Sequence, residues 1–212
     1  MGKGLIGLAK SVQPFYTSQQ MGVEDVFSAV SYLAEHPELG IDVNNIVVSG
    51  NSAGAIISLA CAQAIANGKT EGVPEGFRFK GVISYAGGLI GVKGEPKFNE
   101  TPCPILFFHG MKDNAVAYKH VGAFGKGMWG SSFLVSKLKK KDANYTIYRF
   151  KDRAHDVAAY MNLLWPEAQA FLEKNIMLGQ PCIIDATVNN DSLPIWEGWG
   201  SMTPQQMYNG GQ

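Results

Sequence analysis

The segment Gly50-Asn51-Ser52-Ala53-Gly54 constrains the fold of this chain more than any other, because of what lies on either side of it. A β-branched run precedes it and predicts a strand over 44–49, buried on both faces. Small and apolar residues follow it and predict a helix over 53–67. So sharp a turn from strand to helix needs small flanking residues and holds the serine hydroxyl clear of the sheet. Ser52 is therefore a candidate nucleophile, on a turn formed by Gly50, Asn51 and Gly54.

Alternating strand and helix patterns continue along the chain. Helices are predicted over 22–36, 53–67, 131–141 and 158–177, and strands over 44–49, 79–86, 105–108 and 145–150, the last with the alternation of an edge strand. Such alternation predicts the α/β class, with a parallel sheet of about four strands and helices on both faces. Residues 1–179 would form this domain. Residues 180–212 would form an irregular C-terminal extension packed on it.

Charge and cysteine content exclude several classes of function. The chain has 212 residues, with 18 Lys and Arg against 18 Asp and Glu, so its net charge is zero. A nucleic-acid partner would call for a basic stripe, and the one basic cluster, 137–141, reads as the solvated end of a helix. The three cysteines match no metal-binding spacing. No segment is long enough to cross a membrane and no signal peptide is recognisable, so no compartment is predicted.

A serine hydroxyl needs a general base within hydrogen-bond reach, and the base needs an acid that orients it. Asp113 follows the third predicted strand and His155 follows the fourth. With Ser52, they would all emerge at the carboxyl ends of parallel strands, where such sheets bind ligands. We therefore expect Asp113 to be the acid and His155 the base.

Purely structural roles for the same residues remain open. Asp113 could be a turn residue, and His155 could lie at the cap of a helix. The neighbouring Asp152 and Asp156 are expected to be loop and helix-cap residues. His109 ends a strand and could brace the following loop, whereas His120 would stand exposed in a loop.

Three segments together resemble the α/β-hydrolase superfamily: 50–54, His109-Gly110 with Asp113, and the loop Ala154-His155. The resemblance covers 22–178 and is greatest to the esterase and lipase branch, which includes bacterial carboxylesterases acting on acetylated or feruloylated plant polysaccharides. It implies that Ser52 is the nucleophile, His155 the general base and Asp113 its orienting acid, and that the backbone N–H of Ala53 donates to the oxyanion. The implied reaction is two-step acyl transfer from a small ester, without metal or cofactor.

The chain also departs from this pattern. It contains no His-Gly-Gly sequence, the source of the second oxyanion donor, and the 49 residues before Gly50 cannot hold four strands. We therefore expect an N-terminally truncated form, the C-terminal half of the fold. Its exposed sheet edge would be a possible site of homo-oligomer formation.

The departure keeps two other functions open. One is an impaired hydrolase remnant or binding protein, and the other, ranked lower, is a peptidase of the prolyl-oligopeptidase type. The loop 121–130 is a possible pocket wall, through its residues Phe124, Met128 and Trp129.

Overall fold

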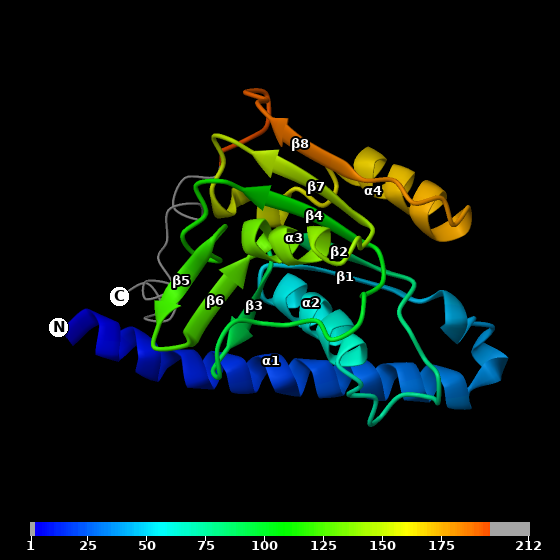
Figure 1. The fold of residues 1–212 in the computed structure, drawn as a ribbon. Helices are drawn as coiled ribbons and strands as arrows, with labels where there is room; N and C mark the ends of the chain where they lie inside the picture. Colours follow the sequence, from blue (N-terminus) through cyan, green and yellow to red (C-terminus); the bar gives the residue numbers. More distant parts are fainter. Residues whose placement is uncertain (1–2, 196–212) are drawn as a thin grey trace.

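The computed structural model describes residues 3–195 (Figure 1). Its short helical turns are the 3₁₀ turns Pro37–Leu39, Val43–Asn45 and His155–Ala159 and the π-helical turn Leu172–Met177. The helices are α1 (Lys3–Glu35), α2 (Ala53–Ala66), α3 (Ser131–Lys139) and α4 (Trp165–Phe171). The strands are β1 (Val47–Asn51), β2 (Gly81–Tyr85), β3 (Gly88–Gly91), β4 (Ile105–Gly110), β5 (His120–Ala123), β6 (Lys126–Gly130), β7 (Tyr145–Phe150) and β8 (Ile184–Val188).

The main sheet has five strands in the order β1-β2-β4-β7-β8, and every neighbouring pair is parallel. This confirms the predicted fold class, with one strand more than expected. The additional strand, β8, lies within the segment 180–212 that was expected to be irregular. Residues 196–212 of that segment lie outside the described residues.

The prediction of β7 as an edge strand is wrong, because β8 covers it. The partly buried residues of β7, Tyr148 and Arg149, contact side chains of the neighbouring strands β4 and β8. Arg149 forms an ion pair with Asp185 of β8, and Asp185 also pairs with Lys139 at a distance of 2.8 Å. A polar residue in this strand therefore marks a cross-strand contact and not an open edge.

Helices cover both faces of the main sheet, as predicted (Figure 1). On one face, buried residues of α1, α2 and α3, such as Phe27, Leu59 and Leu134, pack against the strands. On the other face, α4 and the turn at 155–159 contribute Phe171 and Val157 to a second core. The alternation of side chains along each strand supplies both cores at once.

A second, antiparallel sheet of the order β3-β6-β5 was not predicted. The segment 121–130 was expected to be a loop, but it forms the β5–β6 hairpin. Its strands are rich in glycine, a residue with low strand propensity, and glycines face each other at Gly88 with Gly130 and at Gly91 with Gly127. Side-chain packing from α1 and α2, rather than strand propensity, accounts for this sheet.

Helix α1 begins at Lys3, whereas the sequence predicted a start near Gly22. Glycines and Pro14 obscure the periodicity of its first half. This half packs on the second sheet: Val12 and Tyr16 contact Ile90 of β3 and the residues around it. In addition, the buried amide of Gln19 accepts from the Ile90 N–H (2.9 Å) and donates to the Ile90 carbonyl (3.4 Å). A side chain of α1 thus occupies the place of a strand beside β3.

Strand β1 forms one edge of the main sheet, and its apolar residues are half-buried, so the prediction of burial on both faces is wrong. Because α1 packs against α2 rather than against a further strand, the described residues leave the outer edge of β1 without a partner strand. Pairing of this edge with a second copy stays a prediction. No helix in the described part of the chain combines the length and apolar character needed to cross a bilayer.

We expect Gln19→Ala to lower the free energy of unfolding by about 1–3 kcal/mol, because it leaves the N–H and carbonyl of Ile90 buried without partners. Urea denaturation would measure the change. Gln13→Ala, at an exposed position of the same helix, is the matched control and should alter the value by less than about 0.5 kcal/mol. Equal stabilities of the two variants would contradict the role assigned to Gln19.

Candidate active site

Ser52 occupies the single residue between β1 and α2, and its backbone is strained. Its φ of 51° and ψ of −117° lie where L residues are rarely found, at a cost of order 1–3 kcal/mol. Two hydrogen bonds hold it there: the Ser52 N–H donates to the Tyr85 carbonyl (2.9 Å), and the Ser52 carbonyl accepts from the Ile56 N–H (3.0 Å). The neighbouring strand and the first turn of α2 thus aim the half-buried serine side chain out of the turn.

The two glycines of the turn are not equivalent. A Cβ at Gly50 would lie 2.3 Å from the backbone carbon of Gly54, inside the first turn of α2. A Cβ at Gly54 would meet nothing within 4 Å. Close backbone approach therefore requires glycine at position 50 only, although the sequence suggested that both positions must be small.

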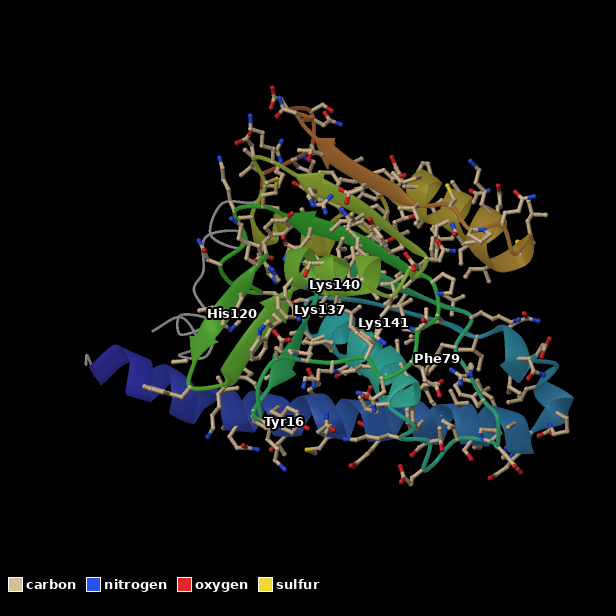
Figure 2. The ribbon with its side chains drawn as sticks, in the orientation of Figure 1. Tyr16, Phe79, His120, Lys137, Lys140 and Lys141 are labelled. Carbon is tan, nitrogen blue, oxygen red and sulfur yellow. The ribbon has the colours of Figure 1, made fainter. Side chains whose placement is uncertain are left out.

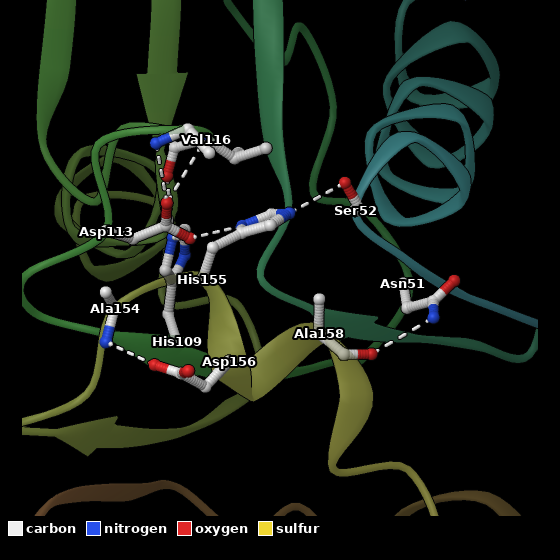
Figure 3. A network of polar contacts seen from close by, with 10 residues as sticks. Asn51, Ser52, His109, Asp113, Val116, Ala154, His155, Asp156 and Ala158 are labelled. Carbon is white, nitrogen blue, oxygen red and sulfur yellow. Dashed lines mark hydrogen bonds and ion pairs between the residues drawn. The ribbon is translucent and has the colours of Figure 1, made fainter. Parts of the chain in front are cut away.

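Asn51 has a role that the sequence did not indicate. Its side-chain amide donates to the Ala158 carbonyl at 3.0 Å (Figure 3). This bond ties the turn of Ser52 to the 3₁₀ turn that begins at His155, and so fixes the two segments relative to each other.

The structure brings Ser52, His155 and Asp113 together in one hydrogen-bonded array (Figure 3). The Nε2 atom of His155 lies 2.9 Å from the Ser52 Oγ, and its Nδ1 atom lies 2.8 Å from the Asp113 Oδ2. The other carboxylate oxygen of Asp113 accepts from the N–H groups of Ala115 (2.9 Å) and Val116 (3.0 Å). Both His155 and Asp113 are buried, so their geometry is fixed by the surrounding structure.

The surroundings of Asp113 favour its ionised form. Burial alone would raise the pKa of its carboxyl group, but hydrogen bonds and charge interactions with His109 and His155 outweigh burial and hold the pKa below its usual range. Asp113 therefore stays a carboxylate near neutral pH. A buried carboxylate in this position can orient the His155 ring and stabilise it when it takes up a proton.

The neighbouring candidates occupy other positions. Asp152 forms an exposed ion pair with Lys112 (2.7 Å), and Asp156 accepts from the Ala154 N–H (3.2 Å). His120 is exposed and stacks on Trp129, with 4.6 Å between the ring centroids. His109 is fully buried and contacts Asp113.

The three predicted pocket residues have different environments. Phe124, at the turn of the β5–β6 hairpin, is 70% exposed. Trp129 is buried between His120 and Phe133. Met128 faces the opposite side of β6, where it packs on a cluster of Val12, Ile56, Ile90 and Val116. Ile56 and Val116 follow Ser52 and Asp113 closely in the sequence, so Met128 alone of the three packs on residues beside the array.

A cavity of about 430 Å³ lies elsewhere. Asn44, Lys80 and Pro104 line it, and each precedes a strand of the main sheet, so it opens at the end of the sheet opposite Ser52. Burial raises the pKa of the Cys103 thiol in its wall to about 12, which keeps that thiol protonated. Among the described residues no group of His, Cys, Asp and Glu is arranged to hold a metal ion.

The basic cluster 137–141 lies at the end of α3, where Figure 2 labels Lys137, Lys140 and Lys141. The ammonium of Lys137 pairs with Glu95 (2.6 Å), and that of Lys141 donates to the Asn99 carbonyl (2.9 Å). These lysines contact neighbouring loops of the same chain. The expected absence of a nucleic-acid partner stays a prediction.

The asymmetry of the two glycines can be tested by matched substitutions. We expect Gly50→Ala to lower the free energy of unfolding by about 1–3 kcal/mol or more, because the first turn of α2 must move to admit the methyl group. Gly54→Ala should leave it unchanged or raise it by up to about 1 kcal/mol, because the site is open and lies in a helix. Chemical denaturation of both variants would measure this. A larger loss of unfolding free energy for Gly54→Ala than for Gly50→Ala would contradict the conclusion that only position 50 requires glycine.

The comparisons with known proteins add one finding. A family model described as an alpha/beta hydrolase fold matches residues 18–100, which include the turn at Ser52 and end before Asp113 and His155. No curated protein and no solved structure gave a match. The match supports the resemblance inferred from the sequence over residues 18–100, and the five-stranded parallel sheet is consistent with part of an alpha/beta-hydrolase fold.

Proposed function

We propose that this protein is a serine carboxylic-ester hydrolase that acts on small acyl esters through an acyl-enzyme. The observation that carries the proposal is the continuous array from the Ser52 Oγ through His155 to the Asp113 carboxylate, with 2.9 and 2.8 Å between the hydrogen-bonding atoms. It lies on a strained strand-to-helix turn of an α/β-hydrolase fold. The family match supports a hydrolase in general.

The hydrogen bonds support the following roles in the proposed reaction. Since Asp113 is a carboxylate and can only accept, the Nδ1 atom of His155 carries a proton, and its Nε2 atom can accept one from Ser52. The Ser52 Oγ attacks the ester carbonyl as Nε2 removes the hydroxyl proton. The tetrahedral intermediate then expels the alcohol, which takes that proton from Nε2, and leaves an acyl-Ser52. Water attacks the acyl group by the same route and restores the serine.

The oxyanion of each intermediate needs donors beside Ser52. Ala53 is the first residue of α2, and the N–H groups in the first turn of a helix have no partner within it. The Ala53 N–H therefore serves as one donor, with the positive end of the helix dipole behind it. The sequence contains no His-Gly-Gly segment, the source of the second donor in the family that it resembles. Because the loss of one oxyanion donor reduces turnover about 100- to 1000-fold, we propose that the protein hydrolyses reactive acyl esters slowly.

Acylated carbohydrates are one substrate class within the proposal, on the strength of the family resemblance alone. The apolar cluster around Met128 borders the segments of Ser52 and Asp113 and would favour a short apolar acyl group over a charged one. The two other candidates, an inactive remnant and a peptidase of the prolyl-oligopeptidase type, are distinguished by the experiments that follow.

We expect Ser52→Ala to reduce kcat/KM for p-nitrophenyl acetate by about 1000-fold or more, because the nucleophile is lost. Ser49→Ala, three residues earlier at an exposed position of β1, is the matched control and should keep the wild-type rate. Steady-state kinetics of the three proteins would measure this. A folded wild-type protein no faster than Ser52→Ala would refute the esterase proposal and favour the inactive remnant.

A fluorophosphonate probe separates the classes further, because it labels only an activated serine. We expect labelling of the wild type at Ser52 and none of Ser52→Ala. Hydrolysis of a prolyl amide at a rate comparable to that of the ester would instead favour the peptidase.

For Asp113→Asn we expect kcat to fall on the order of 10⁴-fold, because a neutral amide no longer holds His155 in the productive tautomer.

The Asp113→Asn variant should also alter the pH dependence of stability. The lowered pKa of Asp113 stabilises the folded state above the unfolded-state value near 3.8, and this contribution is lost as the pH falls through the folded-state pKa. Urea denaturation at pH 7 and pH 3 should therefore show a larger deficit for Asp113→Asn at pH 7. The same deficit at both values would contradict the assignment.

A further inference from the structure

The array at Ser52 includes a second buried imidazole, that of His109, which the proposed reaction does not use. His109 lies near the end of β4, four residues before Asp113, and its side chain is fully buried. Figure 3 shows it beneath the Asp113 carboxylate. A fully buried histidine needs partners for its polar atoms, and those partners indicate what it does.

The partners of His109 belong to the loop that carries Asp113. Its Nε2 atom lies 3.0 Å from the Val116 carbonyl oxygen and 3.3 Å from the Asp113 Oδ2. Both are acceptors, so Nε2 carries the hydrogen. It donates to the Val116 carbonyl and lies in polar contact with the Asp113 carboxylate. The Nδ1 atom has no hydrogen-bond partner among the described residues, and the ring of Tyr118 packs edge-on against the imidazole.

We propose that His109 is a positioning residue that holds the Asp113 carboxylate for His155. This inference rests on the proposed function and deepens it. His155 donates to one carboxylate oxygen, which His109 also contacts, while two backbone N–H groups donate to the other. Of these four groups only His109 is a side chain of the main sheet, so it connects the loop of Asp113 to the central strand β4.

The bond lengths indicate how much His109 contributes. The bond from His155 to Asp113 is the shorter at 2.8 Å and orients the base directly. The longer contact of 3.3 Å, from His109, restrains the Asp113 carboxylate that accepts the bond from His155. Outer partners of this kind, where they support metal ligands, change activity about 10- to 100-fold when they are removed. Loss of the N–H should therefore slow the reaction without abolishing it.

Two substitutions separate the N–H from the volume of the ring. His109→Phe keeps an aromatic ring and removes the donor, whereas His109→Gln keeps an N–H near the position of Nε2. For His109→Phe we expect kcat for p-nitrophenyl acetate to fall about 10- to 100-fold with KM nearly unchanged. For His109→Gln we expect kcat within about threefold of the wild type. Circular dichroism and cooperative thermal unfolding would establish that both variants fold.

A second readout does not depend on activity. The ¹³C chemical shift of the Asp113 carboxyl carbon, followed by NMR against pH, reports the pKa of this group. The pKa should rise toward its ordinary value in His109→Phe and stay low in His109→Gln, because the donor stabilises the carboxylate. If the wild type lacks esterase activity, the proposed function fails, while this titration still decides the positioning role.

Two results would overturn the inference. In the first, His109→Phe matches the wild type in both kcat and the titration of Asp113, so the N–H does nothing for the carboxylate. In the second, His109→Gln loses as much as His109→Phe in folded protein, so the ring and not its N–H is needed.

Discussion

The hydrogen bond from the Ser52 N–H to the Tyr85 carbonyl is the contact on which the rest of the site depends. It continues the pairing of β1 with β2 for one residue beyond the strand, to a point where the backbone has already turned into a strained conformation. Ala86, next to Tyr85, also has a positive φ of 55°, and its N–H donates to the Phe108 carbonyl at 2.7 Å. Strands β1 and β2 are therefore each followed by a residue with a strained backbone, and a hydrogen bond to the next strand holds that residue in place. A parallel sheet can bear this cost because its interior is packed on both faces.

The same edge of the sheet supplies the remaining groups of the site, since β4 lies next to β2 and β7 next to β4, and the loops that follow β4 and β7 carry Asp113 and His155. Each loop is held by contacts of its own. Backbone N–H groups fix Asp113, and the bond from Asn51 to the Ala158 carbonyl fixes the segment of His155. Ser52, His155 and Asp113 thus belong to three segments that are cross-linked close to these side chains, which is the preorganisation that the proposed proton relay requires.

Local patterns in the sequence were enough to predict this arrangement in outline. A β-branched run before a small-residue turn specified β1 and the start of α2, and the order of Ser52, Asp113 and His155 after successive strands placed them at one edge. The roles of His109 and Asn51 could not be predicted, because they depend on which carbonyl or carboxylate lies opposite after folding. The motif predicted that the residues at both position 50 and position 54 must be small, yet only a Cβ at Gly50 would clash with the backbone of the helix.

The parts of the fold that the sequence missed share a physical reason, which is that contacts distant in the sequence stabilise them. The strands of the second sheet contain glycines with no strand preference of their own, and they pair beneath α1 and α2. The first half of α1 contains a proline, yet Val12 and Gln19 dock it on β3. These contacts end on Ile56 and Val116, the first directly after the turn of Ser52 and the second a donor to Asp113. The second sheet and α1 therefore support Ser52 and Asp113 from one side, in a region where the main sheet alone would leave both loops uncovered.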